Sequence, residues 1–75
     1  MEDDVLPELR NYGPSLTTEE ASTVLHLDRA TVSRLLSRGE LPGYRVAGRW
    51  RLRRADVQAV MLGKWSPPDG SREHD

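Results

Sequence analysis

Arginines are concentrated in residues 44–54, which read Tyr-Arg-Val-Ala-Gly-Arg-Trp-Arg-Leu-Arg-Arg. A guanidinium group keeps its positive charge at any physiological pH and can donate two parallel hydrogen bonds to a phosphate. Apolar side chains alternate with the arginines on both sides of the Ala47-Gly48 pair, which is typical of a β-hairpin with one buried face. The segment therefore predicts a hairpin that presents positive charge to an anionic partner.

The register that we expect for this hairpin pairs Val46 with Trp50 and leaves residues 47–49 as its loop. One face then packs on the domain and carries the larger apolar side chains of both arms: Tyr44, Val46, Trp50 and Leu52. The arginines are expected on the opposite, solvated face and at the tip of the loop: Arg45 and Arg51 on the face, Arg49 at the tip. Stacking of Trp50 on a base is an alternative. Trp50 and Leu52 are two residues apart on one strand and therefore point to the same face, which favours a place in the core for Trp50.

A helix predicted over residues 29–38, just before the hairpin, carries the second group of candidate residues. At about 100° per residue, Leu35 and Leu36 flank Val32 and face the core. The opposite side and its flanks combine small side chains with arginines: Arg29, Ala30, Ser33, Arg34, Ser37 and Arg38. Such a face fits the major groove of DNA, where an arginine can donate two hydrogen bonds to guanine. An ordinary solvated helix face is the alternative.

Capping residues predict where the helices begin and end. Thr17 and Glu20 have the spacing of a capping box at the start of a helix that runs to about Leu25. After a sharp turn, Asp28 is a suitable N-cap for the helix described above, and Gly39 terminates it. Two helices joined by so short a turn indicate a helix-turn-helix.

Three further residues are candidate phosphate contacts: Thr18, Arg53 and Arg54. The two arginines come just before a third helix, expected over residues 56–62. They either bind phosphate or merely stand beside the start of that helix, where a positive charge is mildly unfavourable.

The charge of the chain is unevenly distributed. Residues 17–54 carry eight arginines and four acidic residues, whereas the rest of the chain carries three basic and eight acidic ones. The net charge of −1 therefore hides a local excess of +4. Because binding depends on local potential, the central block is expected to bind nucleic acid despite the acidic ends.

Length and composition exclude several classes of protein. A chain of 75 residues buries only about 60% of its unfolded surface, so we expect no catalytic pocket, no enzyme and no small-molecule substrate. Without cysteine there is no thiolate metal site, and neither a metal nor a cofactor is expected. No apolar run approaches the roughly 20 residues of a membrane span, and we expect a cytoplasmic protein without a membrane partner.

The chain is expected to divide into three parts. Residues 1–15 are predicted to form an acidic, mostly irregular arm, residues 16–65 the folded domain, and residues 66–75 a disordered tail.

Four ordered motifs carry a resemblance to a known family: Leu-Thr-Thr-Glu-Glu-Ala from residue 16, Leu-Asp-Arg-Ala-Thr-Val-Ser-Arg-Leu from residue 27, Gly-Glu-Leu-Pro-Gly-Tyr-Arg-Val from residue 39, and Gly-Arg-Trp-Arg-Leu from residue 48. In this set the chain resembles the excisionase family of MerR-like winged helix-turn-helix domains, over residues 16 to about 62. The resemblance implies a mainly α fold with a small β-hairpin, the wing. It places Ala30, Ser33, Arg34 and Ser37 in the major groove, and Arg49 at the tip of the wing.

The resemblance implies a sequence-specific double-stranded DNA-binding protein, and within that class a recombination directionality factor that bends DNA together with an integrase or further copies of itself. A small MerR-like transcriptional regulator and a protein-interaction module on the same fold are the alternatives. The chain departs from the family in its acidity and in His26, where a glycine is usual. We interpret His26 as a turn residue, since histidine tolerates positive φ, with a proton switch or ligand role as the alternative.

Overall fold

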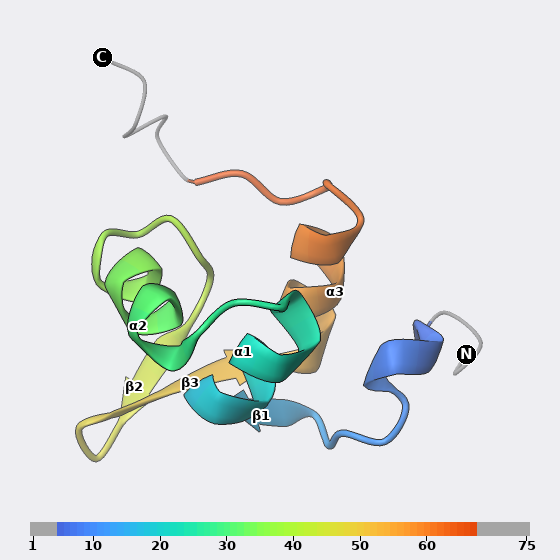
Figure 1. The fold of residues 1–75 in the computed structure, drawn as a ribbon, viewed down its shortest axis with the longest axis horizontal. Coiled ribbons are helices and arrows are strands. Elements are labelled where there is room, and N and C mark those ends of the chain that lie inside the picture. Colours follow the sequence, from blue (N-terminus) through green and yellow to red (C-terminus); the bar gives the residue numbers. More distant parts are fainter. Residues whose placement is uncertain (1–4, 68–75) are drawn as a thin grey trace.

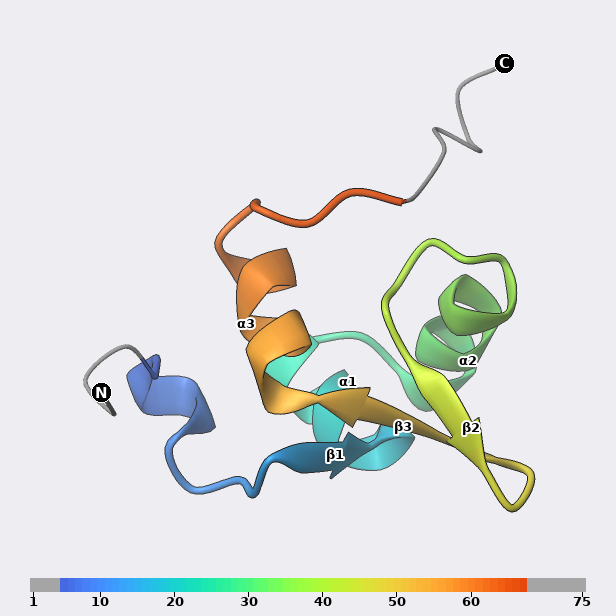
Figure 2. The same cartoon turned by 180° about the vertical axis from the view of Figure 1, so that it is seen from behind.

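The computed structural model describes residues 5–67, which form three helices, a short 3₁₀ helix and a three-stranded sheet (Figures 1 and 2). The elements follow one another as a 3₁₀ helix (Pro7–Leu9), β1 (Ser15–Thr17), α1 (Thr18–Leu25), α2 (Arg29–Ser37), β2 (Tyr44–Val46), β3 (Arg49–Arg53) and α3 (Arg54–Met61). The sheet is antiparallel with the order β1-β3-β2, and the β2-β3 hairpin extends from it as the wing. This is the expected winged helix-turn-helix fold, with a third strand that the sequence did not predict.

Aliphatic side chains from nearly every element meet in one core. The largest fully buried side chains come from the 3₁₀ helix, β1, α2, β3 and α3: Leu9, Leu16, Val32, Leu52 and Val57. Burying a side chain of this size contributes roughly 1.5–3 kcal/mol, so these few contacts carry much of the stability of so small a domain. Leu16 pairs with Leu52 across β1 and β3, which fixes the face of the sheet that meets the helices.

The predicted start of α1 is confirmed. The Glu20 amide donates to Thr17 Oγ1 at 3.1 Å, and the Thr17 amide donates to Glu20 Oε1 at 3.0 Å, which completes the capping box. His26 ends the helix with φ 61° and ψ 40°, and the Leu27 amide donates to the Ser22 carbonyl at 2.9 Å. His26 is therefore the turn residue in a left-handed conformation, as expected, and closes a Schellman motif.

Helix α2 begins and ends where the sequence predicted, to within one residue, whereas α3 begins earlier than predicted. Gly39 terminates α2 with φ 76°, and Asp28 occupies the N-cap position although its side chain accepts no capping hydrogen bond from the helix amides. Helix α3 begins at Arg54, two residues before the expected start at Asp56. It does so because β3 runs directly into it, with Arg53 extended at the N-cap.

The described part of the N-terminal segment, residues 5–15, has little regular structure but packs on the domain. Within the described residues it contains the 3₁₀ helix and the beginning of β1 at Ser15, and Leu9 is fully buried. The Leu6 amide donates to Gln58 Oε1 at 2.9 Å, which ties the segment to α3. Sequence periodicity missed it because three-residue elements are too short to show a period. Residues 1–4 of the expected arm, and residues 68–75 of the expected disordered tail, lie outside the described part of the chain.

The register of the wing also differs from the prediction. Val46 pairs with Arg49, Arg45 with Trp50, and Tyr44 with Arg51. The loop therefore has two residues, Ala47 and Gly48, with φ 52° and 80°. Positive φ at both positions is the geometry of a type I′ turn, whose twist matches that of the flanking strands, so the shorter loop prevails over the three-residue one.

No helix within residues 5–67 has the length and apolar character needed to cross a lipid bilayer.

Candidate nucleic-acid interface

The exposed face of α2 is the face that the sequence predicted. Val32 is fully buried and Leu36 nearly so. On the other side of the helix the candidate residues are exposed or, for Ser33, half-buried: Arg29, Ala30, Ser33, Arg34, Ser37 and Arg38. The structure thus confirms their orientation, and their contact with DNA remains a prediction.

A chain of hydrogen bonds runs along the first turns of this face. Thr31 Oγ1 donates to Asp28 Oδ1 at 2.6 Å, and Arg34 Nη2 donates to Thr31 Oγ1 at 3.5 Å. The hydrogen bond from Thr31 is the largest of the effects that lower the pKa of Asp28, and the charge of Arg34 adds a smaller one. Sequence reasoning gave Thr31 no role, although its spacing of three residues from both partners places all three on one side of a helix.

The inner face of the wing, which meets the helices, carries Trp50, Leu52 and Arg45. The Arg45 guanidinium lies 5.2 Å from the centroid of the Trp50 ring, in a cation–π contact. Because the loop is one residue shorter than predicted, Arg45 shares the face of Trp50 instead of that of Arg51. Trp50 is half-buried and Leu52 fully buried, so the preference for a packed Trp50 over one that stacks on a base agrees with the structure.

The outer face, on the opposite side of the sheet, carries Tyr44, Arg51 and Arg53 together with Ser15 of β1. Tyr44 Oη lies 3.1 Å from Ser15 Oγ, and Arg51 Nε donates to the same Ser15 oxygen at 3.1 Å. The Arg53 guanidinium lies 5.0 Å from the centroid of the Tyr44 ring. Tyr44 and Val46 were expected on the core face and are not there, and Val46 is 52% exposed.

Arg49 and Arg54 also differ from their expected settings. Arg49 is the first residue of β3, paired with Val46, so the tip of the wing is formed by Ala47 and Gly48, and Arg49 lies exposed just behind it. Arg54 Nη1 donates to the Tyr12 carbonyl at 2.7 Å, which engages this guanidinium in holding the N-terminal segment. Arg54 is half-buried at the start of α3, whereas Arg53, at the N-cap, is exposed.

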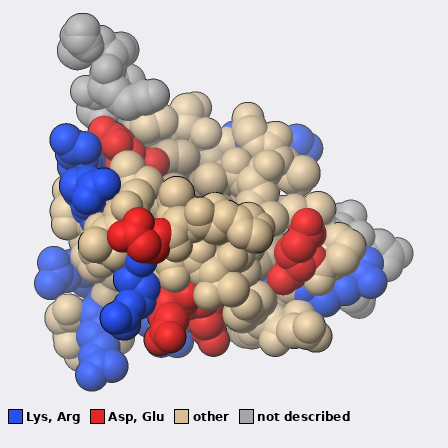
Figure 3. Space-filling model, in the orientation of Figure 1, with Lys and Arg blue, Asp and Glu red and all other residues tan. Residues whose placement is uncertain are grey.

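A concave groove of about 390 Å³ lies between the start of α2 and the wing. It is lined by residues from the start of α1, the start of α2 and β3: Thr17, Thr18, Glu19, Arg29, Ser33, Arg49, Trp50 and Arg51. Figure 3 shows several basic side chains along the edge of the molecule where α2 and the wing lie, with acidic ones beside them, and other basic side chains on the opposite side. Residues that the sequence named separately, on a helix and on a hairpin, thus border one surface.

Residues 15–64 match the model of a family described as a helix-turn-helix domain. The match begins at the first residue of β1 and ends just after α3, so it includes both the helical pair and the wing. No curated protein and no solved structure matches the chain.

Proposed function

Because the chain belongs to this family of helix-turn-helix domains, which supports a DNA-binding function, we propose that it recognises specific sequences in double-stranded DNA. The observation that carries the proposal is the groove between α2 and the wing, which brings Arg29, Arg49 and Arg51 to one concave surface. A local excess of positive charge on a concave surface raises the affinity for an anionic polymer. A helix-turn-helix domain is a binding domain, not a catalytic one.

In the proposed complex α2 enters the major groove. Arg34 is the longest side chain at the centre of its exposed face, and Ala30 and Ser37 beside it are small enough to let the helix approach the base edges. Arg34 would donate two hydrogen bonds to O6 and N7 of a guanine. Arg29 and Arg38, at the two ends of the same face, would contact phosphates.

The wing supplies the second set of contacts in this proposal. Arg49 and Arg51 line the groove and would contact the backbone or the neighbouring minor groove, with Arg45 and Arg53 on either side of the hairpin as further phosphate contacts. Thr18, at the start of α1, lines the same groove and is proposed to contact a phosphate. Arg54 is the weakest candidate, since it holds the Tyr12 carbonyl.

A mobility-shift titration tests the proposal directly. The titration compares a duplex selected from a random library with an unselected duplex of the same length, at two salt concentrations. About five phosphate contacts predict a slope of log affinity against log salt of about −4 to −5, and the selected duplex is expected to bind more tightly at both salts. Absence of binding to any duplex at low salt would refute the proposal and favour a protein-interaction module on the same fold.

Within this class we propose a recombination directionality factor that acts architecturally with an integrase, on the basis of the ordered motifs that resemble excisionases. A single module of this size binds modestly, so useful occupancy would come from an integrase partner or from further copies on adjacent sites. An excision assay with an integrase and its attachment sites, with and without this protein, tests the role. If the protein binds its selected site without affecting excision, the alternative is a small MerR-like transcriptional regulator.

A further inference from the structure

We propose that Ser15 is a positioning residue for DNA binding: through Tyr44 and Arg51 it fixes the wing against the domain and holds the Arg51 guanidinium on the outer face of the wing. This inference rests on the proposed DNA-binding function. Its basis is the outer-face cluster of Ser15, Tyr44, Arg51 and Arg53, whose contacts with one another involve all three strands.

The wing needs such a fixing point because little else holds β2. This strand has three residues, pairs only with β3, and ends in Val46, which is 52% exposed. An isolated two-stranded ribbon is marginally stable in water. Within residues 5–67, β1 is the strand on the other side of β3, so a contact from β2 to β1 connects the wing to the body of the domain.

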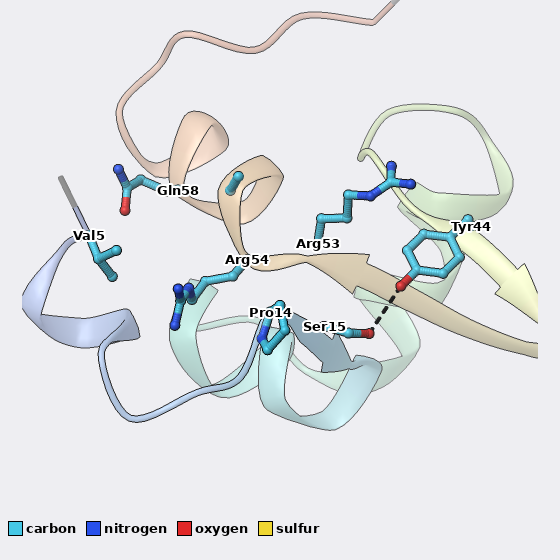
Figure 4. A pocket seen from close by; sticks show the side chains of 8 residues that line it. Val5, Pro14, Ser15, Tyr44, Arg53, Arg54 and Gln58 are labelled. Carbon is cyan, nitrogen blue, oxygen red and sulfur yellow. Dashed lines mark hydrogen bonds between the residues drawn. The ribbon is translucent and has the colours of Figure 1, made fainter. Parts of the chain in front are cut away.

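The Tyr44 side chain makes this contact across the central strand. Strands lie about 4.8 Å apart, so β1 and β2 are separated by about twice that distance, which a tyrosine side chain can span. Tyr44 pairs with Arg51 and Ser15 pairs with Arg53, so the two hydroxyls meet along a diagonal over β3. Figure 4 shows Tyr44 and Ser15 pointing toward one another at the edge of a cleft that Arg53 also lines.

Arg53 strengthens the tie from the side of the ring. Its guanidinium lies 5.0 Å from the Tyr44 centroid, where the negative face of the aromatic ring attracts a cation. Tyr44 is thus held at its hydroxyl and at its ring. A phenylalanine at this position would keep the ring contact and lose only the bond to Ser15.

Ser15 also determines how Arg51 presents its charge. The bond from Arg51 uses Nε, and because the guanidinium is planar, fixing Nε fixes the plane of its two terminal nitrogens. Arg51 is half-buried and lines the groove beside Arg29 and Ser33. The terminal nitrogens are therefore preorganised for a phosphate that reaches the outer face of the wing, which lowers the entropy lost on binding.

The experiment measures the salt dependence of DNA binding for Ser15→Ala, Arg51→Ala and the double variant on one duplex. Loss of one phosphate contact makes the slope less steep by about 0.9. If Ser15 acts through Arg51 and Tyr44, each single variant shows this change, Ser15→Ala weakens binding about 2- to 10-fold at low salt, and the double variant loses less than the sum of the two single variants. Ser15→Thr, which keeps the hydroxyl, is expected to restore the wild-type slope.

Two further variants separate positioning from folding. Tyr44→Phe is expected to weaken binding to a similar extent, whereas Tyr12→Phe, the matched change at the other tyrosine, leaves affinity and slope unchanged. Circular dichroism verifies that each variant is folded. If Ser15→Ala is unfolded, the comparison of Tyr44→Phe with Tyr12→Phe decides whether the bond between Tyr44 and Ser15 contributes to DNA binding.

The outcomes distinguish this inference from the proposed function. A wild-type slope in Ser15→Ala, or additive losses in the double variant, would overturn the positioning role while leaving DNA binding intact. Failure of the wild-type protein to bind any duplex would overturn both.

Discussion

In the proposed complex, Arg34 is the side chain expected to contribute most to base recognition by α2, because Ala30 and Ser37 beside it are exposed and short. Arg34→Ala is expected to cost about 1 to 3 kcal/mol on the selected duplex and to relax the preference at one base pair. Arg49→Ala, which removes a proposed backbone contact, is expected to weaken binding evenly across sequences. Competition between selected and unselected duplexes measures both effects.

The control for these two variants is Arg10→Ala, an exposed arginine remote from the groove whose Nε donates to the Val5 carbonyl. Its removal changes the net charge by the same amount, so it reports the long-range effect of charge alone. Equal losses on every sequence for Arg34→Ala and Arg49→Ala would argue against a reading role for α2.

The Thr31 hydroxyl gives the stability of α2 a dependence on acid pH. The hydrogen bond from Thr31 lowers the pKa of Asp28 in the folded protein. The ionised carboxylate of Asp28 therefore stabilises the folded state at any pH above the ordinary pKa of an aspartate. This stabilisation is lost as the pH falls through the lowered pKa. Thr31→Val is expected to move the pKa of Asp28 upward and to reduce this acid-range loss. Carboxyl titration by NMR tests the shift, with Thr23→Val on α1 as the control. A pKa unchanged by Thr31→Val would assign the lowering to other groups.

At the scale of elements, the sequence predicted the helices well because each carries local signals. Thr17 with Glu20 and the glycine at residue 39 mark ends, and the helical period gives the buried face of α2 without reference to the rest of the fold. Strand β1 was missed because three residues carry no period, and its position depends on pairing with β3, distant in sequence. The predicted face of Tyr44 was wrong for another reason: the turn has two residues instead of three, which shifts the pairing of β2 with β3 by one residue.

The tight turn of the wing stores strain that one substitution can relieve. Ala47 has φ 52°, a left-handed conformation that costs an alanine roughly 1 kcal/mol, whereas Asn-Gly is the preferred pair for a type I′ turn. Ala47→Asn is therefore expected to stabilise the domain by about 0.5–1 kcal/mol in thermal unfolding. Gly48→Ala is expected to act in the opposite direction and destabilise the domain. A Cβ at residue 48 would meet no atom within 4 Å, so the loss of stability would come from the backbone conformation at φ 80° and not from a steric clash. A lower melting temperature for Ala47→Asn would contradict the inference that Ala47 is strained in this turn.

At the scale of the whole molecule, the N-terminal segment determines how large the cooperative unit is. The sequence placed the domain boundary at residue 16, but Leu9 is fully buried, and Arg54 at the start of α3 bonds to the Tyr12 carbonyl. These contacts connect residues separated by more than 40 positions in sequence, which no local pattern reports. The segment thus closes the core beneath α3, and the domain should not fold well without it.

Leu9→Ala tests this closure. Deleting a fully buried leucine side chain typically costs about 2–5 kcal/mol, and a domain of this size has little more stability than that to lose. The variant is expected to be largely unfolded at 37 °C by circular dichroism, and its DNA binding should fall with its helical signal. Leu62→Ala is the matched control, since Leu62 is 46% exposed, and it should change stability by less than about 1 kcal/mol. If Leu9→Ala melts like the wild-type protein, the segment is an appendage, and the domain does begin near residue 16 as the sequence predicted.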